Sequence, residues 1–210
     1  MVLYLLTVFF AMVIICFFNI MFGPETFSHY AIWVIVSTIV SVMVEIAISG
    51  IGSLITVRSP SNWFNPEKKL FVVSKKEQKF YEKVGIRHWK DKVWELGGLG
   101  GFRKNKLKSQ SNAEYLHRFI IESNKGMVGH IINIFTGFLV IFILPLKYAL
   151  RIGFPVAIVG AWLNFLPTCV LRYNLPKLNI AYKRASRLEN RKPENNVVDE
   201  EQEESVQGAN

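Results

Sequence analysis

Four long apolar runs constrain this chain more than any other feature of its sequence. They occupy residues 1–22, 30–57, 131–150 and 153–171. A helix needs about 20 apolar residues to cross the hydrocarbon core of a bilayer, and each run is close to that length. Backbone groups in lipid must be hydrogen-bonded internally, so the runs predict an all-α integral membrane protein with about four transmembrane helices.

The first run is interpreted as a retained helix rather than as a signal peptide. It has no basic residues at its start and no evident small-x-small cleavage site, and a second apolar run follows after a very short connector. Gly23 and Pro24 are expected to end the helix.

The second run carries a polar stripe. Ser37, Ser41, Glu45 and Ser49 recur every fourth residue and therefore share one face of a helix. An ionisable side chain at such depth usually faces protein or water rather than lipid. Glu45 is therefore expected either to line a substrate cavity or to make a hydrogen-bonded contact between helices.

The third and fourth runs predict a helical hairpin. Residues 113–129 are expected to form a helix that enters the third run, with Asn112 as its N-cap. Lys147 and Arg151 separate the two runs and are expected to lie in the turn, where Pro145 would kink or cap a helix.

Charge is divided unevenly along the chain. The segment 57–130 has 16 Lys or Arg against 7 Asp or Glu, whereas everything after Lys192 is acidic or neutral. The positive-inside rule then places the mostly helical segment and both termini in the cytoplasm, at the cell membrane. The expected division is a transmembrane helix pair (1–57), a basic cytosolic or interfacial segment (58–130), a transmembrane hairpin (131–172), a basic juxtamembrane segment (173–192) and a disordered acidic tail (193–210).

An excess of basic residues beside membrane helices favours anionic lipid or a CoA-like donor over nucleic acid as a partner. The two cysteines, Cys16 and Cys169, each lie inside an apolar run, which is typical of packing residues rather than of a disulfide or metal pair. No metal site and no bound cofactor are expected. The sequence leaves the oligomeric state open.

The strongest candidate binding stretch is the sequence around Trp89. Arg87 and Lys90 alternate there with aromatic rings, so one surface is suited to an anionic headgroup or nucleotide while the rings lie in the membrane interface. Interfacial anchoring alone would also explain Trp89 and Lys90. Asp91 is harder to explain as an anchor, because a carboxylate is repelled by anionic lipid.

His130 is the candidate general base, because histidine changes its charge near neutral pH and this one lies where cytosol meets bilayer. Glu122 stands about 12 Å away along the same predicted helix and does not touch His130 directly if the helix is straight. A carboxylate from elsewhere, such as Asp91 or Glu95, is an alternative partner. A purely structural histidine is the competing interpretation.

Four short motifs occur together in order. They are IRHWKD (86–91), GGF with following basic residues (100–106), FIIES with GH (119–130) and PTCVLRYNLPKL (167–178). In this order and spacing the chain resembles the glycosyl-diaponeurosporenoate acyltransferase family, over about residues 60–180. The family is named for the membrane enzyme that adds a fatty acyl chain to the sugar of a carotenoid glucoside, in staphyloxanthin biosynthesis.

The resemblance implies a membrane transferase that moves a fatty acyl group, with acyl-CoA as the probable co-substrate, to a hydroxyl of a membrane-resident, glycolipid-like acceptor. The catalytic residues that it implies are His130, Glu122 and Asp91. The residues implied to bind substrate are Arg87, Trp89, Lys90, Arg172, Tyr173 and Asn174.

One departure from the family pattern concerns Met127. The family often has a glutamate three residues before the histidine, and a carboxylate at that spacing is able to orient the His130 ring. Methionine is not, so this position bears on activity. The alternative function is a non-catalytic membrane protein that binds anionic lipid or scaffolds a partner enzyme.

Overall fold

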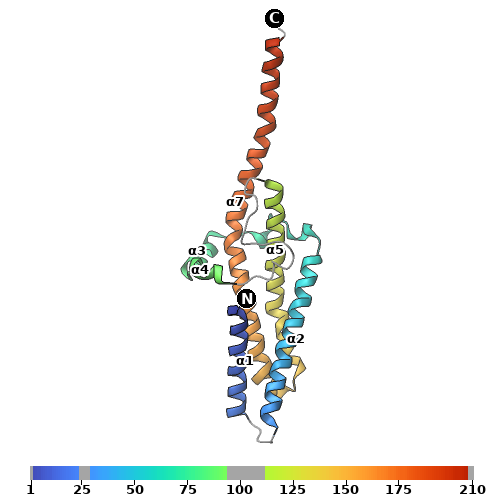
Figure 1. Ribbon diagram of the computed structural model, residues 1–210, viewed down its shortest axis with the longest axis vertical. Coiled ribbons are helices and arrows are strands. Elements are labelled where there is room, and N and C mark those ends of the chain that lie inside the picture. Colours follow the sequence, from blue (N-terminus) through green and yellow to red (C-terminus); the bar gives the residue numbers. More distant parts are fainter. Residues whose placement is uncertain (1, 24–28, 94–111, 208–210) are drawn as a thin grey trace.

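The computed structural model describes the backbone of residues 2–23, 29–93 and 112–207, and side chains as far as residue 190 (Figure 1). These residues are almost entirely helical and contain no strand. Four helical stretches are long and apolar enough to cross a membrane: Tyr4–Phe22, Tyr30–Arg58, Ala113–Ile143 and Leu146–Asn190. The predicted class, an all-α membrane protein with four spans, is confirmed.

Two long helices, α1 (Val2–Phe22) and α2 (Tyr30–Arg58), precede a group of short helices. We call residues 59–93 the cap; it contains η1 (Ser61–Phe64), η2 (Lys69–Phe71), α3 (Lys75–Lys83), α4 (Ile86–Trp89) and η3 (Lys90–Lys92). The second half of the chain forms α5 (Ala113–Thr136), η5 (Gly137–Ile143), α6 (Leu146–Tyr148), η6 (Ala149–Gly153) and α7 (Phe154–Gln207).

The long helices alternate in direction, so several parts of the chain gather toward one end of the bundle (Figure 1). The start of α1, the end of α2, the cap and the start of α5 lie toward the end from which α7 projects. At the opposite end Asn19 Nδ2 donates to the Arg151 carbonyl at 3.0 Å, and Arg151 Nη1 donates to the Phe22 carbonyl at 3.0 Å. The cap and both chain ends therefore share one side of the four spans.

The outer surface of α1 is apolar, and little of it packs against protein. Phe9, Phe10, Phe17 and Phe18 are all more than half exposed. In water such a surface would be unfavourable, whereas in a bilayer it meets lipid of the same polarity.

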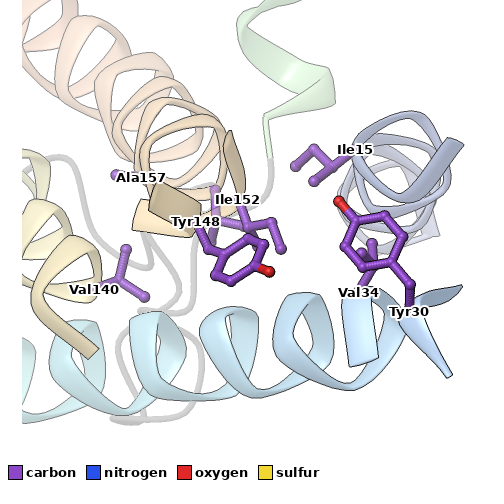
Figure 2. Close-up of a cluster of buried hydrophobic side chains, with 8 residues drawn as sticks. Ile15, Tyr30, Val34, Val140, Tyr148, Ile152 and Ala157 are labelled. Carbon is purple, nitrogen blue, oxygen red and sulfur yellow. The ribbon is translucent and has the colours of Figure 1, made fainter. Parts of the chain in front are cut away.

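A compact cluster packs the helices together at the end opposite the cap (Figure 2). Tyr148 and Ile152 come from the short helices before α7, and they meet Val34 of α2 and Val140 of η5. The Tyr148 ring lies 3.9 Å, centroid to centroid, from the ring of Trp33. This aromatic contact joins α2 to the start of the fourth span.

The polar stripe of α2 faces inward, as its spacing predicts. Ser41 and Glu45 are buried, and Ser49 Oγ donates to Glu45 Oε1 at 3.2 Å. The carboxylate fits against the small residues Gly137 and Gly160 of the neighbouring helices. Glu45 lines a cavity of only about 20 Å³, so its surroundings are those of an interhelix contact rather than of a substrate cavity.

The hairpin turn lies earlier than the sequence predicts. The third span ends at Ile143, Leu144 is extended, and Pro145 is the N-cap of α6. Lys147 and Arg151 therefore lie within the helical segments that follow the turn. Proline restricts the residue before it to extended geometry, and this effect ends the helix while the side chains are still apolar.

The start of α5 is capped as expected. Asn112 Oδ1 accepts from the Tyr115 amide at 2.7 Å, and Glu189 of α7 accepts from the Ala113 amide at 2.8 Å. At the other terminus α7 continues as a helix to Gln207, through the acidic segment expected to be disordered. Glu and Gln are good helix formers, which favours the continuation of the helix through this segment.

We predict that Gly160→Ala lowers thermal stability through Glu45. A Cβ at this position would stand 2.2 Å from Glu45 Oε1, so the carboxylate must move from its packed place. The expected loss is about 1–3 kcal/mol, measured as a lower unfolding temperature in detergent. Gly50→Ala is the control, because a Cβ there meets nothing within 4 Å. Equal unfolding temperatures for the two variants would contradict the proposed contact.

Candidate active site

An ion pair between Glu77 of α3 and Arg172 of α7 attaches the cap to the fourth span. Arg172 Nη2 donates to Glu77 Oε2 at 2.8 Å, and Arg172 Nε donates to Glu77 Oε1. The two side chains are only 25% and 17% exposed, so water screens this pair less than it would a surface pair. Paired parallel hydrogen bonds from one guanidinium to one carboxylate also fix the angle between the two helices.

The start of α3 explains how Glu77 reaches this position. Ser74 is the N-cap and its Oγ accepts from the Glu77 amide at 3.1 Å, which is the first half of a capping box. Tyr81, one turn later, donates its hydroxyl to Glu77 Oε1 at 2.7 Å. The hydrogen bond from Arg172 holds the pKa of Glu77 below its usual value, while burial and the Glu77 carboxylate raise the pKa of Tyr81.

Arg172 makes two further contacts that bind the cap to α5. Its Nη1 donates to the Leu70 carbonyl at 2.8 Å and lies 3.8 Å from Met127 Sδ. Met127 is fully buried there. A glutamate at position 127 would therefore lie beside Arg172.

A second polar contact joins the far side of the cap to the same helix. Arg87 Nε donates to the Tyr173 hydroxyl at 3.1 Å, while its Nη2 pairs with Glu82 at 2.6 Å. Tyr173 is almost fully buried, in a cluster with Tyr81 and Ile86. Consecutive residues of α7, Arg172 and Tyr173, thus each bind a different part of the cap.

His130 lies against α7. Its Nδ1 is 3.0 Å from Asn164 Oδ1, and Asn164 Nδ2 donates to the Gly160 carbonyl at 2.9 Å. Because the amide nitrogen is used by Gly160, the amide oxygen is left as an acceptor for His130. The proton then resides on Nδ1, and Nε2 is the basic nitrogen of the neutral ring.

The other two residues predicted to be catalytic lie elsewhere. Glu122 Oε1 pairs with Lys125 Nζ at 3.4 Å, and this ammonium also donates to the Val57 carbonyl at the end of α2. Asp91 is exposed on η3. The structure does not bring His130, Glu122 and Asp91 together into one site.

Among the residues predicted to bind substrate, three bind the cap to α7: Arg87, Arg172 and Tyr173. Trp89 is half-buried and its Nε1 donates to the Val84 carbonyl at 3.2 Å. Lys90 and Asn174 are half-buried, on the cap and on α7 respectively. The motif at 100–106 and Glu95 lie outside the described residues.

A pocket of about 440 Å³ lies between the cap, α7 and the first turns of α1. Its walls are mostly apolar and aromatic. The residues that line it are Tyr4 and Thr7 from α1, Phe80, Val84, Trp89, Lys92 and Val93 from the cap, and Trp162, Leu163, Phe165, Leu166 and Cys169 from α7. This volume is within the usual range of small-molecule sites.

The pocket and His130 occupy adjoining faces of α7. Leu163 lines the pocket, and the next residue, Asn164, contacts His130. Successive helical residues point about 100 degrees apart, so the two features lie around one helix rather than on unrelated surfaces.

Two residues of this region were missed by the sequence-based predictions. Glu77 had a signal, since Ser74 and Glu77 have capping-box spacing, but the same spacing occurs in any ordinary helix start. Asn164 is a polar residue inside an apolar run, which is the kind of residue that usually faces protein in a membrane. Neither signal identifies the partner.

The spans, the cap and the apolar pocket at their junction define an integral membrane protein with a site suited to a lipidic ligand. The chain matches the family described as glycosyl-4,4'-diaponeurosporenoate acyltransferase over residues 60–184, and it belongs to that family. The match confirms the resemblance noted in the sequence and indicates an acyltransferase of carotenoid glycoside biosynthesis. No curated protein and no solved structure gives a significant match to the chain.

The matched residues begin in the cap and end within α7. They include both partners of the Glu77–Arg172 ion pair and of the Arg87–Tyr173 contact. The family region therefore contains the attachment of the cap to the fourth span.

We predict that Glu77→Gln loosens the cap. A neutral amide leaves Arg172 partly buried without its counter-ion, at a cost of about 1–3 kcal/mol. The measurements are tryptic cleavage within α3, which has several lysines, and the unfolding temperature. Glu67→Gln, at an exposed position of the same cap, is the control. Cleavage of the Glu77→Gln protein at the wild-type rate would disprove the role of the ion pair.

The same pair predicts a pH dependence. Because the pKa of Glu77 is lowered by folding, its stabilising effect is present above the ordinary value of 4.5 and is lost as the pH falls through the lowered pKa. The unfolding temperature of the wild type should therefore decline at acid pH. In Glu77→Gln the decline should be smaller, and an identical decline in both proteins would exclude Glu77 as its source.

Proposed function

We propose that this protein transfers a fatty acyl group from acyl-CoA to a hydroxyl of a glycolipid-like acceptor at the cytoplasmic face of the cell membrane. Membership of the acyltransferase family carries the proposal. The four candidate spans and the apolar pocket of about 440 Å³ support it, since both substrates would be amphiphiles.

The cap is suited to a donor that arrives from water. Arg87 and Lys92 are exposed, and Lys90 is half-buried beside them. Cations grouped at a membrane surface attract the phosphates of CoA as well as anionic lipid. Arg172 is not counted among them, because its guanidinium is mostly buried against Glu77 and the Leu70 carbonyl, whereas Arg87 is exposed even though it pairs with Glu82. The positive-inside rule places this basic surface in the cytoplasm.

His130 is the proposed general base, with Asn164 contacting its Nδ1. In the reaction, His130 Nε2 removes the proton from the acceptor hydroxyl while that oxygen attacks the thioester carbonyl. The new C–O ester bond forms, the C–S bond breaks, and the CoA thiolate takes up the proton. Ester and free CoA are the products, and no oxidant or reductant is required.

We predict that His130→Ala reduces transfer by at least about 100-fold, the usual effect of removing a general base. Asn164→Ala should cause a smaller loss, because the ring remains but its tautomer and orientation are no longer fixed. The measurement is mass spectrometry of lipid extracts from cells with and without each protein, in which the product gains the mass of an acyl chain.

His117→Ala is the matched control. His117 is also on α5, but its ring lies against Tyr182, at 5.4 Å between centroids, and has no place in the proposed reaction. Undiminished transfer by His130→Ala would remove this residue from the mechanism. Identical lipid extracts with and without the inserted wild-type protein would favour a lipid-binding or scaffolding protein instead.

A further inference from the structure

We propose that the pocket beneath the cap binds the acyl chain of the donor. This inference rests on the proposed function but concerns a separate step, which is where the hydrocarbon part of the donor is held before transfer. Nothing in the family match assigns that site. Its position, its lining and its charge each favour the donor chain.

The pocket lies where membrane and cap meet. Tyr4 and Thr7 are at the start of the first span. The pocket-lining residues of the fourth span are Trp162, Leu163, Phe165, Leu166 and Cys169. Phe80, Val84 and Trp89 close the pocket from the cap. A ligand in this position is surrounded by apolar side chains at the level of the bilayer boundary, and the basic surface of the cap lies beside it.

The lining selects hydrocarbon rather than a polar group. Among the described residues that line the pocket, Lys92 is the one charged side chain, and most of their side chains are apolar. A buried sugar or nucleotide would need several hydrogen-bond partners to offset the loss of water. A hydrocarbon chain needs none, and the Lys92 ammonium is suited to the carbonyl or phosphate groups at its polar end.

The donor needs such a pocket more than the acceptor does. An acceptor dissolved in the bilayer already has its hydrocarbon surrounded by lipid, so a protein pocket gains little free energy from burying it. An acyl chain that arrives attached to CoA comes from water, and each methylene that enters an apolar pocket gains the full hydrophobic free energy. A roof made by the water-facing cap is therefore an expected feature of a donor site.

The turn between α3 and α4 holds the cap side of the pocket in place before any ligand binds. Gly85 follows α3 with a φ of 67°, a left-handed conformation that glycine adopts without strain, and α4 then turns back. The Trp89 indole bonds the Val84 carbonyl across this turn at 3.2 Å. Val84 and Trp89 consequently present their side chains to the same pocket.

The test is photolabelling of the purified full-length protein in phospholipid vesicles with palmitoyl-CoA that carries a diazirine at the end of its chain. We expect labels in 80–93 or 162–169, removed by excess palmitoyl-CoA and not by free CoA. Labels confined to lipid-facing positions such as Phe142 would overturn the proposal. Equal labelling of the pocket by a phospholipid with the same diazirine chain would also overturn it, because the pocket would then hold bilayer lipid.

Val84→Trp fills the pocket from a position that is 45% exposed, so the added ring needs no rearrangement of a core. It should reduce pocket labelling by about tenfold, the effect of excluding two methylene groups, and shift the product toward shorter acyl chains. Val72→Trp is the matched control, since Val72 is 59% exposed on the same cap outside the pocket. Unchanged labelling and chain length in Val84→Trp would disprove the assignment.

The labelling separates this proposal from the proposed function. His130→Ala should bind and label like the wild type, because the site does not require the transfer step. Pocket labelling without any lipid product in cells would reject acyl transfer and keep the acyl site. Normal lipid product with unchanged chain length and labelling in Val84→Trp would keep acyl transfer and reject the site.

Discussion

The arrangement of this protein depends on one partly buried ion pair, between Glu77 in the cap and Arg172 in the fourth span. The cap is short and basic, and its buried residues Phe64, Phe71, Tyr81 and Ile86 pack against α5 and α7 rather than into a core of its own. Arg172 adds a polar attachment at the centre of these contacts, because its guanidinium reaches Glu77 and the Leu70 carbonyl of the cap and lies beside Met127 of α5. Without that attachment the pocket beneath the cap would lose one wall.

This attachment changes how the family motifs are interpreted. Arg172 and Tyr173 are the part of the last motif that a sequence reader would assign to substrate, yet both are engaged by the cap. Each contacts the cap, and residues of the cap line the apolar pocket. The proposed chemistry falls instead to His130 and Asn164, a pair whose members are separated by 34 residues and meet only when α5 packs on α7.

Some of the site was within reach of the sequence and some was not. Residues such as His130 and Trp89 are recognisable because polar or aromatic groups at a membrane boundary need a reason to be there. The partners of His130 and Arg172 are not recognisable, because Asn164 and Glu77 meet them only through helix packing and cap folding that no local pattern encodes. Asp91, which the resemblance implies to be catalytic, lies exposed on η3.

The sequence by itself determined the four spans, the inward polar face of α2 and the N-cap of α5, because these follow from hydropathy, helical period and capping chemistry within about 20 residues. The tertiary structure decided the earlier turn at Pro145, the partner of Glu45, the attachment of the cap and the pocket. Those features depend on which helix faces meet, and contact between faces is a property of packing rather than of any one segment.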